Sequence, residues 1–279
     1  MYKASTLALV LIMLVSCDNK DQQKADLLND STTFISDTDI NTDTTFIGRK
    51  PSTSDSVSMA DYSKLDSFMN SHQLGEALKV ADKLLERDSS NTYALAEKSI
   101  IYTRMANDGD KAKLDEAGKL ARQSFKLAPK DATTNLAMAL YYGALTNEAN
   151  ITEKGSYSTK IKQYAERCLQ LSPMHPEANY IMGRWYYGLA DLGKMKKMVA
   201  QKIIKDANAK EPTFELALSY FQKALKVRPD DFSYNYFTGA CLYKMDKKSE
   251  GKTYMNKAMA ISPRNKQERE LASNAKEFK

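Results

Sequence analysis

The residues best suited to metal binding or nucleophilic chemistry are three cysteines and two histidines in a chain of 279 residues. Cys168 and Cys241 lie within helix-like segments, and His72 and His175 each lack a second ligand at metal-site spacing. The sequence contains no glycine-rich phosphate loop, no Gly-x-Ser-x-Gly elbow and no Cys-x-x-Cys pair. We therefore expect structural histidines, two core thiols that are too far apart to pair, no cofactor and no enzyme activity.

Cys17 is the one cysteine whose surroundings predict a reaction. It follows a basic residue, Lys3, an apolar run at 7–15 and the ending Leu14-Val15-Ser16-Cys17. These are the three parts of a secretory signal, and the run is too short to span a bilayer. The ending resembles a bacterial lipobox. We expect residues 1–16 to be a signal peptide and Cys17 to carry acyl chains such as palmitate; the alternative is an ordinary signal with a coincidental cysteine.

The destination in the bacterial envelope depends on the residue after the cysteine. Asp18 would retain a lipoprotein in the inner membrane under the enterobacterial sorting rule. The Asn-, Lys- and Tyr-rich composition suggests lineages in which that rule does not hold. We therefore expect a lipid-anchored protein of the outer membrane, on either its periplasmic or its surface side.

Residues 17–58 are predicted to be a disordered tether. They show no sustained apolar periodicity, and residues 18–55 contain eight Asp against four Lys or Arg. Such a segment buries too little apolar surface to offset the entropy lost on ordering. The interpretation is a flexible, acidic spacer; a pairing segment around Phe34 or Phe46 is the alternative.

Beyond residue 58 the apolar residues repeat at helical spacing. The clearest unit places Ala217, Phe221, Ala224 and Pro229 at offsets 0, 4, 7 and 12. Offsets 0, 4 and 7 share one helix face, where small residues let a neighbouring helix approach, and proline ends the helix. The next unit repeats these offsets 34 residues later with Gly251, Met255, Ala258 and Pro263, and earlier units match more loosely.

This pattern resembles the tetratricopeptide repeat. It predicts an all-α fold over residues 59–279: a right-handed α-solenoid of about five helix pairs plus a capping helix at 265–278. Helices are expected after the prolines at 135–146, 179–189 and 235–245. Two units are longer than the repeat, which predicts a loop at 147–157 and a helix-like insert at 190–211.

The insert is strongly basic. Its Lys194, Lys197, Lys202 and Lys205 belong to a set of six lysines against one aspartate at 194–210. We interpret the insert as an extension of the helical stack. A surface for anionic lipid or lipopolysaccharide and a partner-binding surface are the alternatives.

One segment resembles a narrower family. Residues 175–187 read His-Pro-Glu-Ala-Asn-Tyr-Ile-Met-Gly-Arg-Trp-Tyr-Tyr and precede the long insert and the unit at 217–229. This arrangement is similar to the regulator of microtubule dynamics family over about residues 175–278. The resemblance implies a membrane-tethered helical-repeat scaffold with a concave recognition surface around Arg184 and Trp185. Microtubule binding does not carry over, because a bacterial envelope holds no tubulin.

Aromatic and basic residues on two of the expected helices predict a groove for a partner. The candidate residues are Tyr180, Arg184 and Tyr187 on one helix and Tyr236, Tyr243 and Lys244 on the next. Aromatic and arginine side chains supply much of the energy of interfaces, so the stripes suit an extended peptide or an acidic tail. The alternative is that many of these tyrosines are packing residues, and Trp185 is expected to pack between helices.

These features favour a non-catalytic, membrane-anchored scaffold or adaptor that binds a protein or peptide partner. An outer-membrane or pilus assembly lipoprotein is the alternative, followed by a glycan-capture lipoprotein, which the supply of 16 Tyr against one Trp disfavours. The net charge of +6 divides into an acidic tether and a basic repeat domain. That division points to acidic partners and not to nucleic acid; it leaves the oligomeric state open.

The lipidation hypothesis predicts that Cys17→Ser abolishes labelling of the protein by a radioactive or clickable palmitate analogue in cells. The matched control is Cys168→Ser, which removes a thiol outside the lipobox and should leave labelling intact. Unchanged labelling of Cys17→Ser would contradict the hypothesis.

Overall fold

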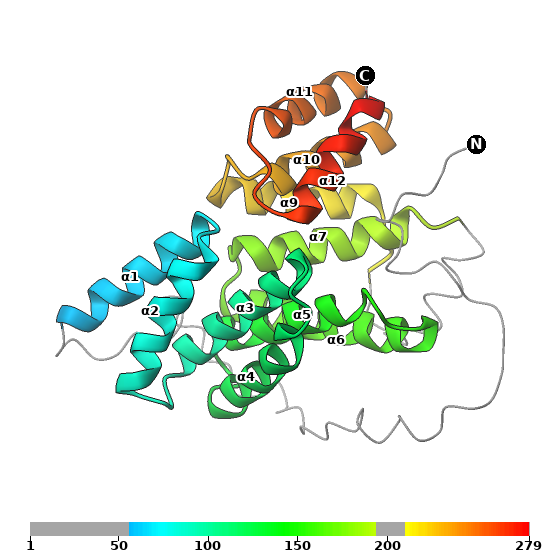
Figure 1. Ribbon diagram of the computed structural model, residues 1–279. Coiled ribbons are helices and arrows are strands. Elements are labelled where there is room, and N and C mark those ends of the chain that lie inside the picture. Colours follow the sequence, from blue (N-terminus) through cyan, green and yellow to red (C-terminus); the bar gives the residue numbers. More distant parts are fainter. Residues whose placement is uncertain (1–55, 194–209, 279) are drawn as a thin grey trace.

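The computed structural model describes residues 56–193 and 210–278, and within these ranges the chain forms helices joined by short turns, with no strand (Figure 1). The α-helices are α1 (Ser56–Asn70), α2 (Leu74–Arg87), α3 (Thr92–Asp108), α4 (Lys113–Leu127), α5 (Ala132–Leu145), α6 (Ile151–Leu171), α7 (Pro176–Ala190), α9 (Phe214–Val227), α10 (Phe232–Lys244), α11 (Lys248–Met259) and α12 (Lys266–Asn274). A 3-10 turn, η3 (Ala275–Phe278), follows α12.

The helices stack as pairs. The pairs are α1/α2, α3/α4, α5/α6, α7/α9 and α10/α11, and the second helix of each pair also packs against the first helix of the next. The segment α12–η3 then packs on α10 and α11 at the end of the stack (Figure 1). The prediction of an all-α solenoid with five helix pairs and a capping helix is confirmed.

A recurring asparagine holds the turns between pairs. Asn235 donates through Nδ2 to the carbonyl oxygens of Pro229 at 2.7 Å and Asp231 at 2.9 Å. Asn135 and Asn179 make the same two bonds in their own turns. In each turn the residue four before the asparagine caps the new helix through its side chain. The helices α5, α7 and α10 therefore begin three residues earlier than the apolar periodicity predicts.

The predicted loop at 147–157 is wrong. Only residues 146–150 connect α5 to α6, and residues 151–157 form the first two turns of α6. Asn150 and Glu153 form a capping box, in which each side chain accepts from the other residue's backbone N–H. Tyr157 then packs against Tyr142 of α5 at 5.8 Å between ring centroids. Capping and this tertiary contact outweigh the polar composition.

The core contains the side chains that the repeat pattern assigns to it. Cys168 and Cys241 are buried free thiols. Trp185 is buried between helices and donates through Nε1 to Ser158 Oγ at 3.0 Å. These three predictions are confirmed.

Several predicted features lie outside the described residues. They are the signal peptide at 1–16, the tether from Cys17 to residue 55, and the lysines of the insert, Lys194, Lys197, Lys202 and Lys205. Residues 56–58, which the prediction assigned to the tether, form the start of α1 instead. On either side of the insert, α7 ends at Ala190 and Thr213 caps α9. Among the described helices, none combines the length and apolarity that crossing a membrane requires.

The close packing of α7 on α9 predicts a cost for adding one methyl group. A Cβ at Gly183 would lie 2.5 Å from the ring of buried Phe221, whereas a Cβ at Gly188 on the same helix meets nothing within 4 Å. We expect Gly183→Ala to lower the free energy of unfolding by about 1–3 kcal/mol. Gly188→Ala should leave it unchanged or raise it by up to about 1 kcal/mol. Urea denaturation followed by circular dichroism measures both, and equal effects would contradict this packing.

Candidate partner-binding surface

The first helices of the pairs contribute to one continuous surface. The phenol of Tyr93 on α3 donates to Asp66 on α1. The ring of Tyr180 on α7 packs against Tyr234 on α10, 5.1 Å between centroids. We call this the inner surface and define it by residues from four first helices and one turn: Asp66, Tyr93, Glu97, Arg104, Glu177, Tyr180, Arg228 and Tyr234.

Arg104 links three helix pairs across the inner surface. Its guanidinium donates to Glu177 Oε2 on α7 at 2.7 Å and to the carbonyl oxygen of Met69 on α1 at 3.2 Å. Both side chains of the ion pair are 17% exposed. Burial opposes the charge of each group, but their mutual attraction raises the pKa of Arg104 and, with Arg228, holds the pKa of Glu177 below its usual value.

Glu97 and Arg228 are the ionisable groups of the inner surface that lack a close partner. Among the described residues neither side chain makes a hydrogen bond or an ion pair within 4 Å. Burial raises the pKa of Glu97 to about 8; Asp66 and Glu177 reinforce that shift, and Arg104 and Arg228 oppose it. A carboxyl group and a guanidinium with unused hydrogen-bonding capacity are therefore available to a ligand.

The residues that carry this charge were missed in the sequence. Glu97 and Arg104 stand seven apart on α3, so they share one helix face. The available signal was an acidic and a basic residue seven positions apart on the same face of one helix. Glu177 and Arg228 come from later pairs, and only the stacking brings them close.

The first set of predicted groove residues, Tyr180, Arg184 and Tyr187, lies partly exposed on α7. Arg184 donates to the phenol oxygen of Tyr180 at 2.8 Å and stacks over Phe237, 4.2 Å from its centroid. Tyr187 packs edge-on against Phe214 and Phe237. These residues are therefore brought together as predicted, and each also packs on its neighbours. Their contact with a partner stays a prediction.

The second set of predicted groove residues, Tyr236, Tyr243 and Lys244 on α10, contacts other parts of this chain. Tyr236 is buried at 5% exposure, and the phenol of Tyr243 donates to the backbone oxygen of Phe278 at 2.7 Å. Lys244 forms an ion pair with Asp191 at 2.6 Å. The α12–η3 segment therefore occupies the place that the sequence assigned to a partner at Tyr236 and Tyr243.

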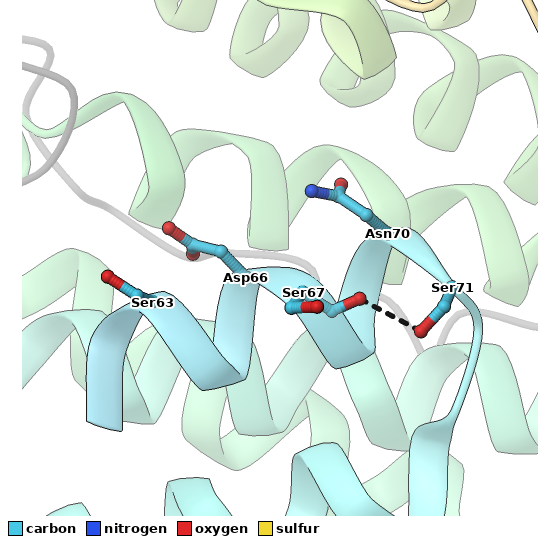
Figure 2. A pocket seen from close by; sticks show the side chains of 5 residues that line it. All are labelled: Ser63, Asp66, Ser67, Asn70 and Ser71. Carbon is cyan, nitrogen blue, oxygen red and sulfur yellow. Dashed lines mark hydrogen bonds between the residues drawn. The ribbon is translucent and has the colours of Figure 1, made fainter. Parts of the chain in front are cut away.

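A shallow polar pocket lies at the α1 end of the inner surface. Figure 2 shows its lining, in which Asp66 is joined by exposed hydroxyl and amide side chains of α1 and of the turn that follows it. The lining residues are Ser63, Asp66, Ser67, Asn70 and Ser71. The hydroxyl of Ser71 donates to the backbone oxygen of Ser67 at 2.9 Å. Hydroxyl and amide groups of this kind can bond to the backbone of an extended chain.

The histidines have local structural positions. His175 caps α7 by accepting from the backbone N–H of Ala178, and burial lowers its pKa to about 4. His72 occupies the left-handed turn between α1 and α2, with its Nε2 atom 3.3 Å from Asp108. Within the described ranges no three His, Cys, Asp or Glu side chains form a group that could hold a metal ion.

Comparison with known proteins gives one family and distant relatives. The family model described as "Regulator of microtubule dynamics protein 1-3" matches residues 59–278. Regulator of microtubule dynamics protein 1 of Mus musculus is 22% identical over 73% of this chain and 69% of its own length. Protein 3 of Rattus norvegicus is 24% identical over 50% of this chain, and the match spans only 30% of that relative.

A solved crystal structure of MamA protein aligns with 72% of this chain and 90% of its own length at 14% identity and a TM-score of 0.39. The family match extends over both the N-terminal and C-terminal repeats. It is therefore wider than the C-terminal resemblance seen in the sequence.

The raised pKa of Glu97 predicts a pH dependence of stability. Between its unfolded pKa near 4.5 and its folded pKa of about 8, the folded protein keeps a proton that the unfolded chain releases. The free energy of unfolding should therefore fall as pH rises, by about 1 kcal/mol per pH unit for this one proton. His175 acts in the opposite sense below pH 6.5, where the unfolded chain takes up a proton first.

In the window from about pH 7 to 8 the unfolded chain has released most of the His175 proton, so the slope there reports chiefly on Glu97. Urea denaturation should show the fall in the wild type and a flat response in Glu97→Gln. The exposed control Glu76→Gln should behave like the wild type. A fall of the same size in Glu97→Gln would contradict the assignment.

Proposed function

This chain belongs to the regulator of microtubule dynamics family, and on that premise we propose that it is a non-catalytic scaffold that holds a protein partner on its inner surface. Helical-repeat scaffolds bind partners through the extended surfaces that stacking creates. The family name describes what the relatives regulate. The partner proposed for this chain is a protein other than tubulin.

The observation that carries the proposal is the charged centre of the inner surface. Arg104 and Glu177 neutralise each other and hold α3 against α7 at 2.7 Å. Glu97 and Arg228 have no such bond among the described residues. A carboxyl and a guanidinium group on the same surface can bond to the N–H and C=O groups, or to the charged side chains, of an extended protein segment.

The surroundings of that centre favour a polypeptide. Tyrosine rings lie around it: Tyr93 and Tyr234 are buried beneath the surface and Tyr180 is partly exposed, and each ring contacts a neighbouring helix. Rigid aromatic rings next to charged groups are the usual composition of protein-binding hot spots. The polar pocket on α1 lies beside Asp66 and extends the surface.

Anchoring at the membrane is a separate part of the proposal. The support is the sequence of residues 1–17, which has the parts of a bacterial lipoprotein signal ending at Cys17. Lipid at Cys17 would place the repeat domain next to the outer membrane of a bacterial envelope, at the end of an acidic tether. The partner is then a protein of the envelope, and acidic segments are favoured by the positive charge of the domain.

The test is crosslinking in the cells that produce the protein, followed by pull-down and quantitative mass spectrometry. The double variant Glu97→Gln, Arg228→Ala removes the two groups that lack a close partner, the carboxyl and the guanidinium, without adding bulk. The control Glu250→Gln, Lys252→Ala likewise replaces one acidic and one basic residue, at exposed positions of α11.

We expect partners that the wild type and the control capture to fall about tenfold with the inner-surface variant, which corresponds to about 1.4 kcal/mol. Thermal unfolding of each purified variant shows that the fold is kept. An identical set of captured proteins from all three chains would refute the proposed surface.

A further inference from the structure

The helix α10, which is the first helix of the last pair, is buried along most of its length. Residues 232–242 of α10 are all buried. The helices α9 and α11 cover two sides of α10, and the α12–η3 segment covers part of the remainder (Figure 1). This covered part includes Tyr236 and Tyr243, whose rings contact Phe278. Tyr236 also packs on Phe237, which packs on Tyr180 of the inner surface, so the covered part adjoins that surface.

The α12–η3 segment docks through one stripe of residues. Glu268, Leu271 and Ala275 are buried, and partly exposed Phe278 follows at the same face. Their spacing of three, four and three residues is that of an amphipathic helix. The Phe278 ring lies 4.9 Å from the ring of Tyr243, and that tyrosine donates to the Phe278 backbone oxygen.

Polar bonds fix the start of the segment. Arg264 reaches Asp231 Oδ2, on the cap of α10, and Glu268 Oε1, both at 2.7 Å. The backbone N–H of Lys266 donates to Asp108 Oδ1, at the end of α3, at 3.0 Å. The segment thus bridges the second helix pair and the last one.

Apart from these contacts, few buried apolar side chains hold the α12–η3 segment in place. The helix α12 has nine residues, and Leu271 is its only fully buried apolar side chain. Helices this short do not persist without tertiary contacts, and elements with few buried apolar contacts open at low free-energy cost. The helix α10 would remain packed between α9 and α11 after the segment left.

We propose that the α10 surface beneath α12 and η3 is a docking site for an amphipathic helix of a protein partner, and that the α12–η3 segment is an internal occupant which that helix displaces. This proposal rests on the proposed function, since the site adjoins the inner surface. The partner chemistry follows from the present occupant: an acidic residue, a leucine-sized residue, a small residue and an aromatic residue at positions 0, 3, 7 and 10.

A peptide of this chain tests the site without a known partner. The probe is a fluorescein-labelled synthetic peptide of residues 264–278, and fluorescence anisotropy measures its binding to the full chain. In the wild type the attached segment competes with the peptide, so binding should be weak. Phe278→Ala in the full chain weakens the attached segment only, and it should tighten peptide binding by up to about tenfold.

Two controls keep the measurement specific. Ser273→Ala, on the exposed face of α12, should leave peptide affinity at the wild-type value. A peptide that itself carries Phe278→Ala should bind the full-chain Phe278→Ala variant at least about tenfold more weakly than the natural peptide. Leu271→Ala in the full chain provides a second, independent way to weaken the attached segment and should also tighten binding.

The proposal is overturned if neither full-chain variant binds the peptide more tightly than the wild type. Equal binding of the natural and Phe278→Ala peptides would also overturn it. Since the peptide contacts α10, its binding should be unaffected by Glu97→Gln, Arg228→Ala. A failed partner test at the centre of the inner surface and a failed docking site on α10 can therefore be told apart.

Discussion

The contact between Arg104 and Glu177 is the interaction on which the arrangement of the inner surface depends. It joins the second helix pair to the fourth, and the additional bond from Arg104 to Met69 ties in the first. A stack of pairs held only by neighbouring contacts could open or close along its axis. An ion pair across the inner surface fixes that curvature, and losing either partner would leave a mostly buried charge uncompensated.

The helical repeat could be predicted because each unit carries its own local signals. Proline ends one helix, and small residues at fixed offsets allow the next to pack closely, as at Gly183 beneath Phe221. The loop prediction at 147–157 was wrong because it relied on the polar composition of the segment and did not weigh the helix-capping residues. Asn150 and Glu153 mark a helix start, and Tyr157 gains a partner on α5 only once the chain has folded.

The site was less predictable because it is assembled from distant parts of the chain. Tyr180, Arg184 and Tyr187 share one helix, so their proximity follows from their spacing. Glu97 and Arg228 are 131 positions apart in the numbering, and the electrostatic effect of Arg228 on Glu97 arises only once the helix pairs have stacked. The covering of Tyr236 and Tyr243 by Phe278 likewise depends on where the last helix packs, which periodicity does not specify.

The most direct test of this account is a double-mutant cycle on the free energy of unfolding, with Arg104→Met, Glu177→Gln and the two combined. If the ion pair holds α3 against α7, the double variant should lose less stability than the sum of the single variants, by about 1–3 kcal/mol. Additive losses, within about 0.5 kcal/mol, would contradict the claim that this contact across the inner surface organises the stack.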